Sequence, residues 1–189
     1  MEGVMVQLSN ERRSHARLGP CPPRLCRAQR TAAADWAMKC CMSVDAWHLF
    51  MWMLDRLPES DQWPTQMAAV VLANKMHHTV PQMNKHIIGK WKWRITPARL
   101  REEELRVLAH LNWALPSFIM TYCVRGMAGV FPSMQVYDAM LRQSVRVVRN
   151  KACLSVVDVC DDCVRQCVKD EMALQFWSKY ERGMRSHLL

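Results

Sequence analysis

Residues 64–76 read PTQMAAVVLANKM, a stretch that is apolar around most of its circumference when it is wound into a helix. Pro64 suits the first turn of such a helix, where a backbone N–H would have no partner. A helix that is apolar on nearly every side must be covered by its neighbours. We therefore expect this segment to be enclosed at the centre of an α-helical domain.

The preceding residues predict two more helices. Residues 44–54 read VDAWHLFMWML and are also apolar nearly all round, as in a buried helix. Before them, Ala33, Trp36, Ala37 and Cys40 recur at helical spacing.

The following residues complete a compact unit. A short fourth helix is expected over residues 83–89, and a fifth begins at Thr96-Pro97, where Thr can cap the helix and Pro can take its first position. The fifth is expected to continue to Trp113. The fold class predicted from these patterns is all-α.

Composition agrees with a helical chain and limits its function. The 189 residues include only six glycines, and half of them are of hydrophobic type, so a sizeable core can be buried. The net charge of +9 would permit nucleic-acid binding, but much of it lies in the first thirty residues, without a helix-turn-helix, zinc-finger or RNP-like pattern. We expect residues 1–28 to be a mobile basic tail and nucleic acid not to be the partner.

Cysteine usage and hydropathy bear on the compartment. No window approaches the roughly 18 consecutive apolar residues of a membrane span. The nine cysteines are odd in number and lack the spacing of a secreted disulfide scaffold, which favours reduced thiols in the nucleus and cytoplasm.

A cysteine stripe offers competing chemistry. Cys160, Cys163 and Cys167, with Cys153 before them, could hold a metal, because Cys-x-x-Cys is a common ligand pair. The same spacing places them on one helix face beside valines, and no second ligand pair follows at zinc-site spacing, so core packing explains them better. A zinc- or nucleic-acid-binding helical module remains the alternative, and metal analysis of the purified protein separates the two interpretations.

No enzyme motif emerges from the chain. It has no phosphate-cradling glycine loop and no Gly-x-Ser-x-Gly elbow, and the acidic run Glu102-Glu103-Glu104 is interpreted as a helix face. We expect a protein that is not an enzyme and needs no cofactor or metal.

Several segments, taken in order, resemble the D-type cyclins. Residues 72–81, LANKMHHTVP, look like the family's alanine-serine-lysine-methionine run and the proline that follows it. Residues 95–100, ITPARL, lead to Glu104 and then to residues 111–115, LNWAL, in the family's spacing from Lys75 onwards. The resemblance implies a cyclin-box five-helix domain over 29–116 and a reduced second cyclin-like helical region over 117–189.

That resemblance assigns roles to particular residues. It implies that Lys75 and Glu104 contact a cyclin-dependent protein kinase, with apolar contact from Met76, Leu108 and Leu115. It also implies that Arg30 and Asp55 form a structural brace between the first two helices. The expected function is that of a regulatory subunit that binds and activates such a kinase in cell-cycle control. A fainter resemblance, at residues 36–41 and 89–94, is to the Speedy/RINGO kinase activators, which point to the same class of partner.

The sequence departs from the family at the positions through which many cyclins bind substrates. Many cyclins carry large apolar residues on the first helix as a docking patch, whereas this chain has Gln29, Ala32 and Ala33 there and retains only Trp36. The Leu-x-Cys-x-Glu motif near the amino terminus is absent. Kinase binding is therefore the better supported half of the family's function.

Overall fold

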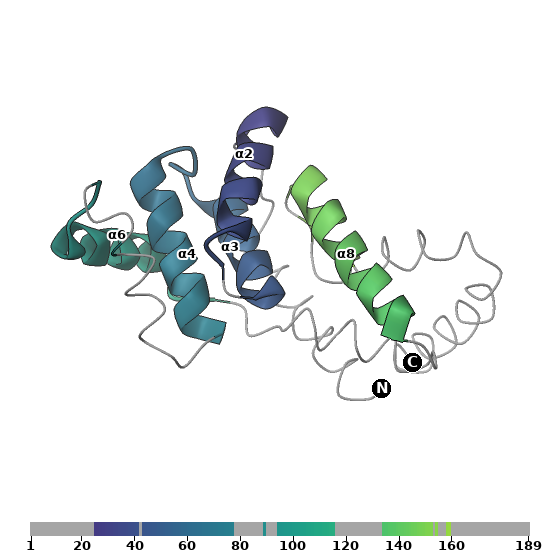
Figure 1. The fold of residues 1–189 in the computed structure, drawn as a ribbon. Helices are drawn as coiled ribbons and strands as arrows, with labels where there is room; N and C mark the ends of the chain where they lie inside the picture. The colour runs from purple at the N-terminus through teal and green to yellow at the C-terminus, as the bar shows by residue number, and fades with distance from the viewer. Residues whose placement is uncertain are drawn as a thin grey trace, which may run out of the picture. The chain divides into compact units, whose positions relative to one another are not determined.

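A computed structural model describes residues 25–41, 43–77, 89, 94–115, 134–152, 154 and 158–159 (Figure 1). The chain divides into two compact units, one of Cys21–Pro116 and one of Met1–Pro20 with Ser117–Leu189. Every element in the described part is a helix and none is a strand, so the all-α fold class is confirmed.

The first unit opens with helix α2, Arg27–Met38. The side-chain oxygen of Gln29 accepts a hydrogen bond from the backbone N–H of Cys26 at 3.1 Å, which caps the start of the helix. Residues 27 and 28, which the sequence placed in the tail, therefore belong to the first turn of α2.

Helix α3, Val44–Arg56, starts at Ser43, whose hydroxyl accepts from the N–H of Ala46 at 3.1 Å. Its eleven consecutive residues from Asp45 to Asp55 are all buried. The indole N–H of Trp47 donates to the backbone carbonyl of Ala34 at 3.0 Å and so ties α3 to α2.

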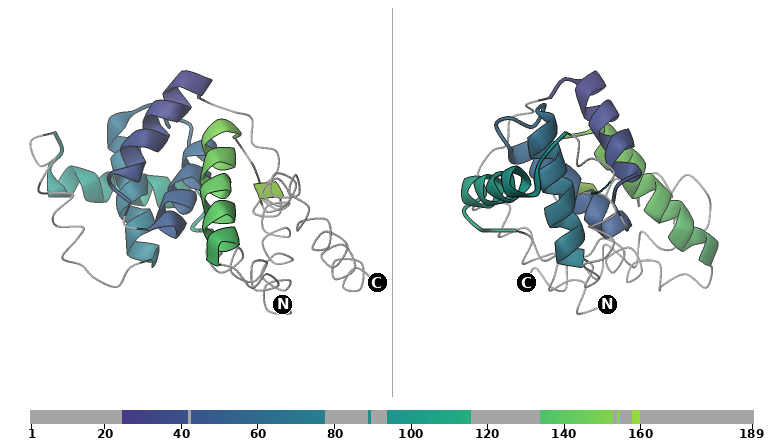
Figure 2. Two further views of the ribbon diagram at one scale, coloured as in Figure 1. Left: turned by 45° about the vertical axis from the view of Figure 1, so that its right-hand side comes forward. Right: turned by 60° about the vertical axis from the view of Figure 1, so that its left-hand side comes forward.

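Helix α4, Trp63–His77, is buried continuously from Met67 to Asn74. It packs against α3 and against α6, and α6 crosses it at a steep angle (Figures 1 and 2). The segment predicted to be enclosed is buried as expected, and α3, which was also predicted as a buried helix, is covered at least as fully.

Helix α6, Pro97–His110, begins where the sequence predicted, with the Thr96 hydroxyl accepting from the N–H of Arg99 at 3.2 Å. It ends three residues earlier than predicted, since Asn112 and Trp113 have φ values of 50° and 58°, in the left-handed region. The N–H of Trp113 instead donates to the carbonyl of Leu108 at 2.8 Å, which closes the helix end. The predicted helix over 83–89 lies outside the described residues except for Gly89.

The other unit contains helix α8, Met134–Asn150. Met140, Ser144, Val147 and Val148 are buried along one side of it, whereas Arg142 and Arg146 are exposed. The rest of the helical region predicted over 117–189 lies outside the described residues, apart from residues 151, 152, 154, 158 and 159. Among the described helices, none has the length and apolar character needed to cross a membrane.

Candidate partner-binding surface

Arg30 and Asp55 form an ion pair in the interior of the first unit. Arg30 comes from α2 and Asp55 from α3, and their side chains are only 5% and 7% exposed. Each buried charge offsets the desolvation cost of the other, because either one alone would be left buried without a compensating charge. The pair therefore fixes how α2 lies against α3.

Lys75 and Glu104 meet at the surface, where the last turn of α4 lies against α6. The two side chains form an ion pair but differ in access to solvent: Lys75 is 49% exposed and Glu104 only 12%. A pair this open to water adds little to stability, at most about 1 kcal/mol. Its more evident effect is to hold an ammonium group in a fixed place on an accessible surface.

Apolar side chains adjoin both members of this pair along the chain. Met76, which follows Lys75, is 52% exposed, and Leu105, which follows Glu104, is 51% exposed. Leu108, one turn further along α6, and Leu115 are half-buried. We call Lys75, Met76, Glu104, Leu105 and Leu108 the α4–α6 surface.

Leu105 was not among the predicted contact residues, because the family resemblance assigns that role to other positions. Its spacing carried the signal: it is out of phase with Leu100, Val107 and Leu111, which are buried. Trp113, which the family register marks, is 65% exposed because its backbone turns away from the helix.

Glu103 differs from its two acidic neighbours, with which the sequence analysis grouped it on one helix face. Its carboxylate is 2% exposed and lies 2.8 Å from Arg99 and 2.7 Å from Arg106. Arg106 also contacts Glu59 at 2.5 Å and donates to the hydroxyl of Thr65 at 3.1 Å. This Arg106 network joins the turn after α3, the start of α4 and the middle of α6.

A groove of about 160 Å³ lies beside the Arg106 network. Its apolar wall comes from Leu57, Pro58 and Val107, and its polar residues are Glu59, Thr65, Arg106 and His110. Arg106 already contacts two carboxylates there, so the groove presents no uncompensated charge for a ligand.

Two titratable groups in the first unit are shifted by burial. Burial lowers the pKa of His48 to about 3, and the ring stands edge-on to Trp47 at 5.1 Å between centroids. Burial, and then the neighbouring Cys40, raise the pKa of the Cys41 thiol. Neither group is poised to exchange a proton near neutral pH.

The cysteines proposed as competing ligands, Cys153, Cys160, Cys163 and Cys167, lie outside the described residues. Within the part that the structure describes, no group of three or more His, Cys, Asp or Glu side chains could hold a metal ion.

The first helix shows where a docking patch would lie. Gln29 and Ala32 are exposed on α2, whereas Ala33 is buried. Trp36 is half-buried and packs edge-on against Phe50 at 6.3 Å between ring centroids. The exposed family-patch positions, Gln29 and Ala32, therefore carry no large apolar side chain, and the exposed Met38 lies at the far end of α2.

No model of a known protein family matches this chain, and no curated protein matches it either.

Proposed function

We propose that this chain is a cyclin-like regulatory subunit that binds and activates a cyclin-dependent protein kinase in the nucleus and cytoplasm. One observation carries the proposal. Lys75 and Glu104, the two residues that the cyclin resemblance marks as kinase contacts, are 29 residues apart in the chain and form a contact between two helices.

The α4–α6 surface suits a protein partner. It has a charged centre on two helices, and an exposed apolar residue follows each member of the pair along the chain. Interface energy concentrates in a few desolvated anchors of this kind. A lysine ammonium has three hydrogen-bond donors, and Glu104 does not occupy all of them. Carbonyl or carboxylate groups of an incoming kinase helix are the expected acceptors.

The buried Arg30–Asp55 pair supports the same proposal from the interior. The resemblance assigns these two residues to a brace between the first two helices, and they pair between α2 and α3. In the proposal they keep the bundle rigid and do not contact the kinase. The chain then acts by positioning its partner and needs no catalytic residues of its own.

Exchanging the charges of the surface pair tests the proposal. Lys75→Glu combined with Glu104→Lys keeps an internal ion pair and the net charge, so the fold should survive. The exchange reverses the charge that a partner contacts at each of the two positions. Disrupting a charged contact at an interface typically costs roughly 2–5 kcal/mol in binding free energy, about thirtyfold or more in affinity. We therefore expect binding to a cyclin-dependent kinase, measured by titration calorimetry, to be lost.

The control exchanges two exposed charges on a different helix. Asp35→Lys on α2 with Lys39→Asp at its C-cap also preserves net charge, and both residues are remote in sequence from the α4–α6 surface. Helix content and Tm should match the wild type in both variants. Undiminished kinase binding by the exchanged Lys75–Glu104 variant would contradict the assignment of the surface.

A further inference from the structure

A short exposed motif stands at the start of α6. Thr96-Pro97 is the only Ser-Pro or Thr-Pro dipeptide in the sequence, and Arg99 follows three residues after the threonine. All four residues from Thr96 to Arg99 are exposed. The proposed function does not use this motif.

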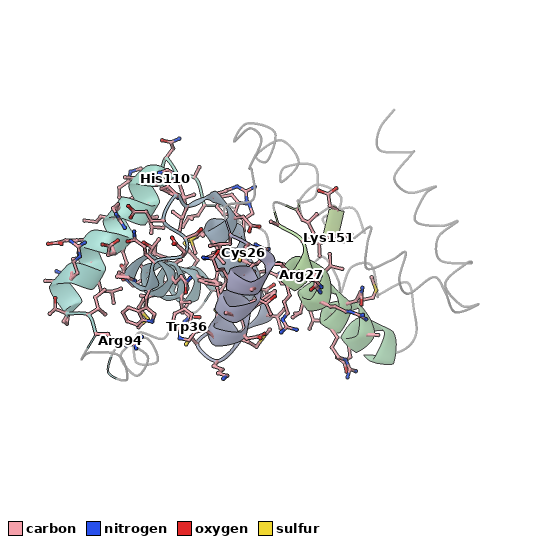
Figure 3. All side chains as sticks on the ribbon, turned by 90° about the horizontal axis from the view of Figure 1, so that it is seen from above. Cys26, Arg27, Trp36, Arg94, His110 and Lys151 are labelled. Carbon is pink, nitrogen blue, oxygen red and sulfur yellow. The ribbon has the colours of Figure 1, made fainter. Side chains whose placement is uncertain are left out.

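The Thr96 hydroxyl is held in an orientation that leaves its own proton available. Its oxygen accepts the hydrogen bond from the N–H of Arg99 through a lone pair, so the hydroxyl hydrogen is not used in that contact. The backbone of Thr96 is extended, with φ −75° and ψ 154°. The residues before it, from Arg94, are also outside the helix (Figure 3).

We propose that Thr96 is a phosphorylation site for a proline-directed protein kinase. Such kinases accept, directly after the reacting hydroxyl, a residue that has no backbone N–H, and only proline meets that condition. Several of them also prefer a basic side chain three residues after the hydroxyl, a charge pattern of the kind that kinases use for specificity. Arg99 supplies that charge, with its side chain 60% exposed.

The reaction is an ordinary phosphoryl transfer. The Thr96 oxygen forms a bond to the γ-phosphorus of ATP, the bond from that phosphorus to the bridging oxygen breaks, and ADP leaves. The hydroxyl proton passes to the carboxylate base of the modifying kinase. The inference goes beyond the proposed function, because here the chain is a substrate, whatever partner its α4–α6 surface binds.

The phosphate would act on the stability of α6. It adds a charge of about −1.5 to −2 at the positive end of the helix dipole, next to backbone N–H groups that have no partner inside the helix. Glu104 lies eight residues further along, about 12 Å at the rise of an α-helix. That separation exceeds the Debye length of about 8 Å at physiological salt, so the direct effect on the Lys75–Glu104 pair is small.

The test uses the full-length chain and labelled ATP. A cyclin-dependent kinase already saturated with its own regulatory subunit serves as the proline-directed enzyme, so that binding to the α4–α6 surface is not required. We expect one phosphate per chain, located at Thr96 by mass spectrometry. The absence of labelling, under conditions that fully phosphorylate a Thr-Pro-x-Arg peptide, would overturn the proposal.

Variants separate the motif from the fold. Thr96→Asn keeps a good helix cap but removes the hydroxyl, so labelling should vanish while Tm is unchanged. Thr96→Ser should retain labelling, and Pro97→Ala should lose it although the hydroxyl remains. Ser43→Asn is the matched control, because Ser43 caps α3 in the same way but precedes valine. Labelling that persists in Thr96→Asn would also overturn the proposal.

Phosphorylation itself supplies an independent readout. The phosphorylated chain should melt higher than the unmodified chain, by about 2–4 °C, because the added negative charge lies at the positive end of the helix dipole. A lower Tm on phosphorylation would overturn the inferred effect on α6.

Discussion

Arg30 and Asp55 are buried together, and neither charge can be removed alone without leaving the other in a poorly solvated place. We therefore expect Asp55→Ala to lower the free energy of unfolding by about 3–5 kcal/mol. Urea denaturation followed by circular dichroism measures it.

Removing both charges of that pair should cost much less. The double variant Arg30→Met with Asp55→Leu leaves no unpaired charge, so most of the lost stability should return. Glu102→Ala serves as a control, because Glu102 is 66% exposed in its pair with Arg99 and should change stability by about 0.5 kcal/mol or less. If Asp55→Ala is as mild as this control, the brace does not stabilise the fold.

His48 gives the protein a predictable response to acid. Its pKa is about 3 in the folded chain, against an ordinary value of 6.5, so the unfolded chain binds the proton more readily. Stability is therefore fully present above about pH 6.5 and falls as the pH drops toward 3. At pH 5 the loss from this residue should be about 2 kcal/mol.

Denaturation of the wild type and of His48→Gln at pH 7 and pH 5 measures that loss. The glutamine variant does not titrate in this range and should show the smaller change between the two pH values. Equal changes in the two proteins would mean that His48 is not the group responsible.

The Arg30–Asp55 pair could be anticipated because the family register placed these two residues opposite each other. Lys75 and Glu104 were predicted as contacts to a kinase and not as partners of each other, and periodicity alone paired neither set. Glu103 could not be distinguished so easily from Glu102 and Glu104. Three adjacent acids look alike in composition, yet they are 66%, 2% and 12% exposed, because the buried side of α6 runs through Leu100, Glu103 and Val107. The helical spacing of Leu100, Glu103 and Val107 indicates that Glu103 lies on the buried side of α6. Its charge, however, favours an exposed position.

At the scale of elements, the apolar pattern of the sequence predicted correctly where the enclosed helices lie. α3 and α4 are apolar nearly all round, and both are enclosed. The end of α6 was less predictable, since the turn at Asn112 and Trp113 depends on left-handed backbone values that no propensity of tryptophan favours.

The Arg106 network should control how α6 sits on the rest of the first unit. Arg106→Ala removes the contacts to Glu59 and Thr65 and leaves the buried Glu103 with Arg99 alone. We expect a loss of about 2 kcal/mol in the free energy of unfolding, measured by urea denaturation.

A neighbouring arginine provides the comparison. Arg101 is exposed on the same helix, so Arg101→Ala should change stability by about 0.5 kcal/mol or less. Adding Glu103→Leu to the Arg106→Ala variant should recover stability, because the buried carboxylate is then gone. No recovery would mean that Arg106 acts through packing of its side chain and not through the carboxylate.

At the scale of the whole molecule, the sequence predicted an all-α chain because long stretches are rich in residues that favour helices, such as alanine, leucine, methionine and arginine, and glycine is scarce. The arrangement of helices needed more than pattern. α4 contacts both α3 and α6, and the amide of the buried Asn74 donates to the carbonyl of Cys40 at 3.1 Å, which ties α4 to the turn after α2.

The central claim is that the chain regulates a kinase, and activation tests it most directly. The purified chain would be titrated into isolated catalytic subunits of several cyclin-dependent kinases, and phosphorylation of a peptide substrate would be measured. For at least one kinase we expect activity to rise and saturate at one chain per kinase, and the Lys75→Glu, Glu104→Lys variant to have no effect. If no kinase binds the chain or gains activity from it, the cyclin-like function is contradicted.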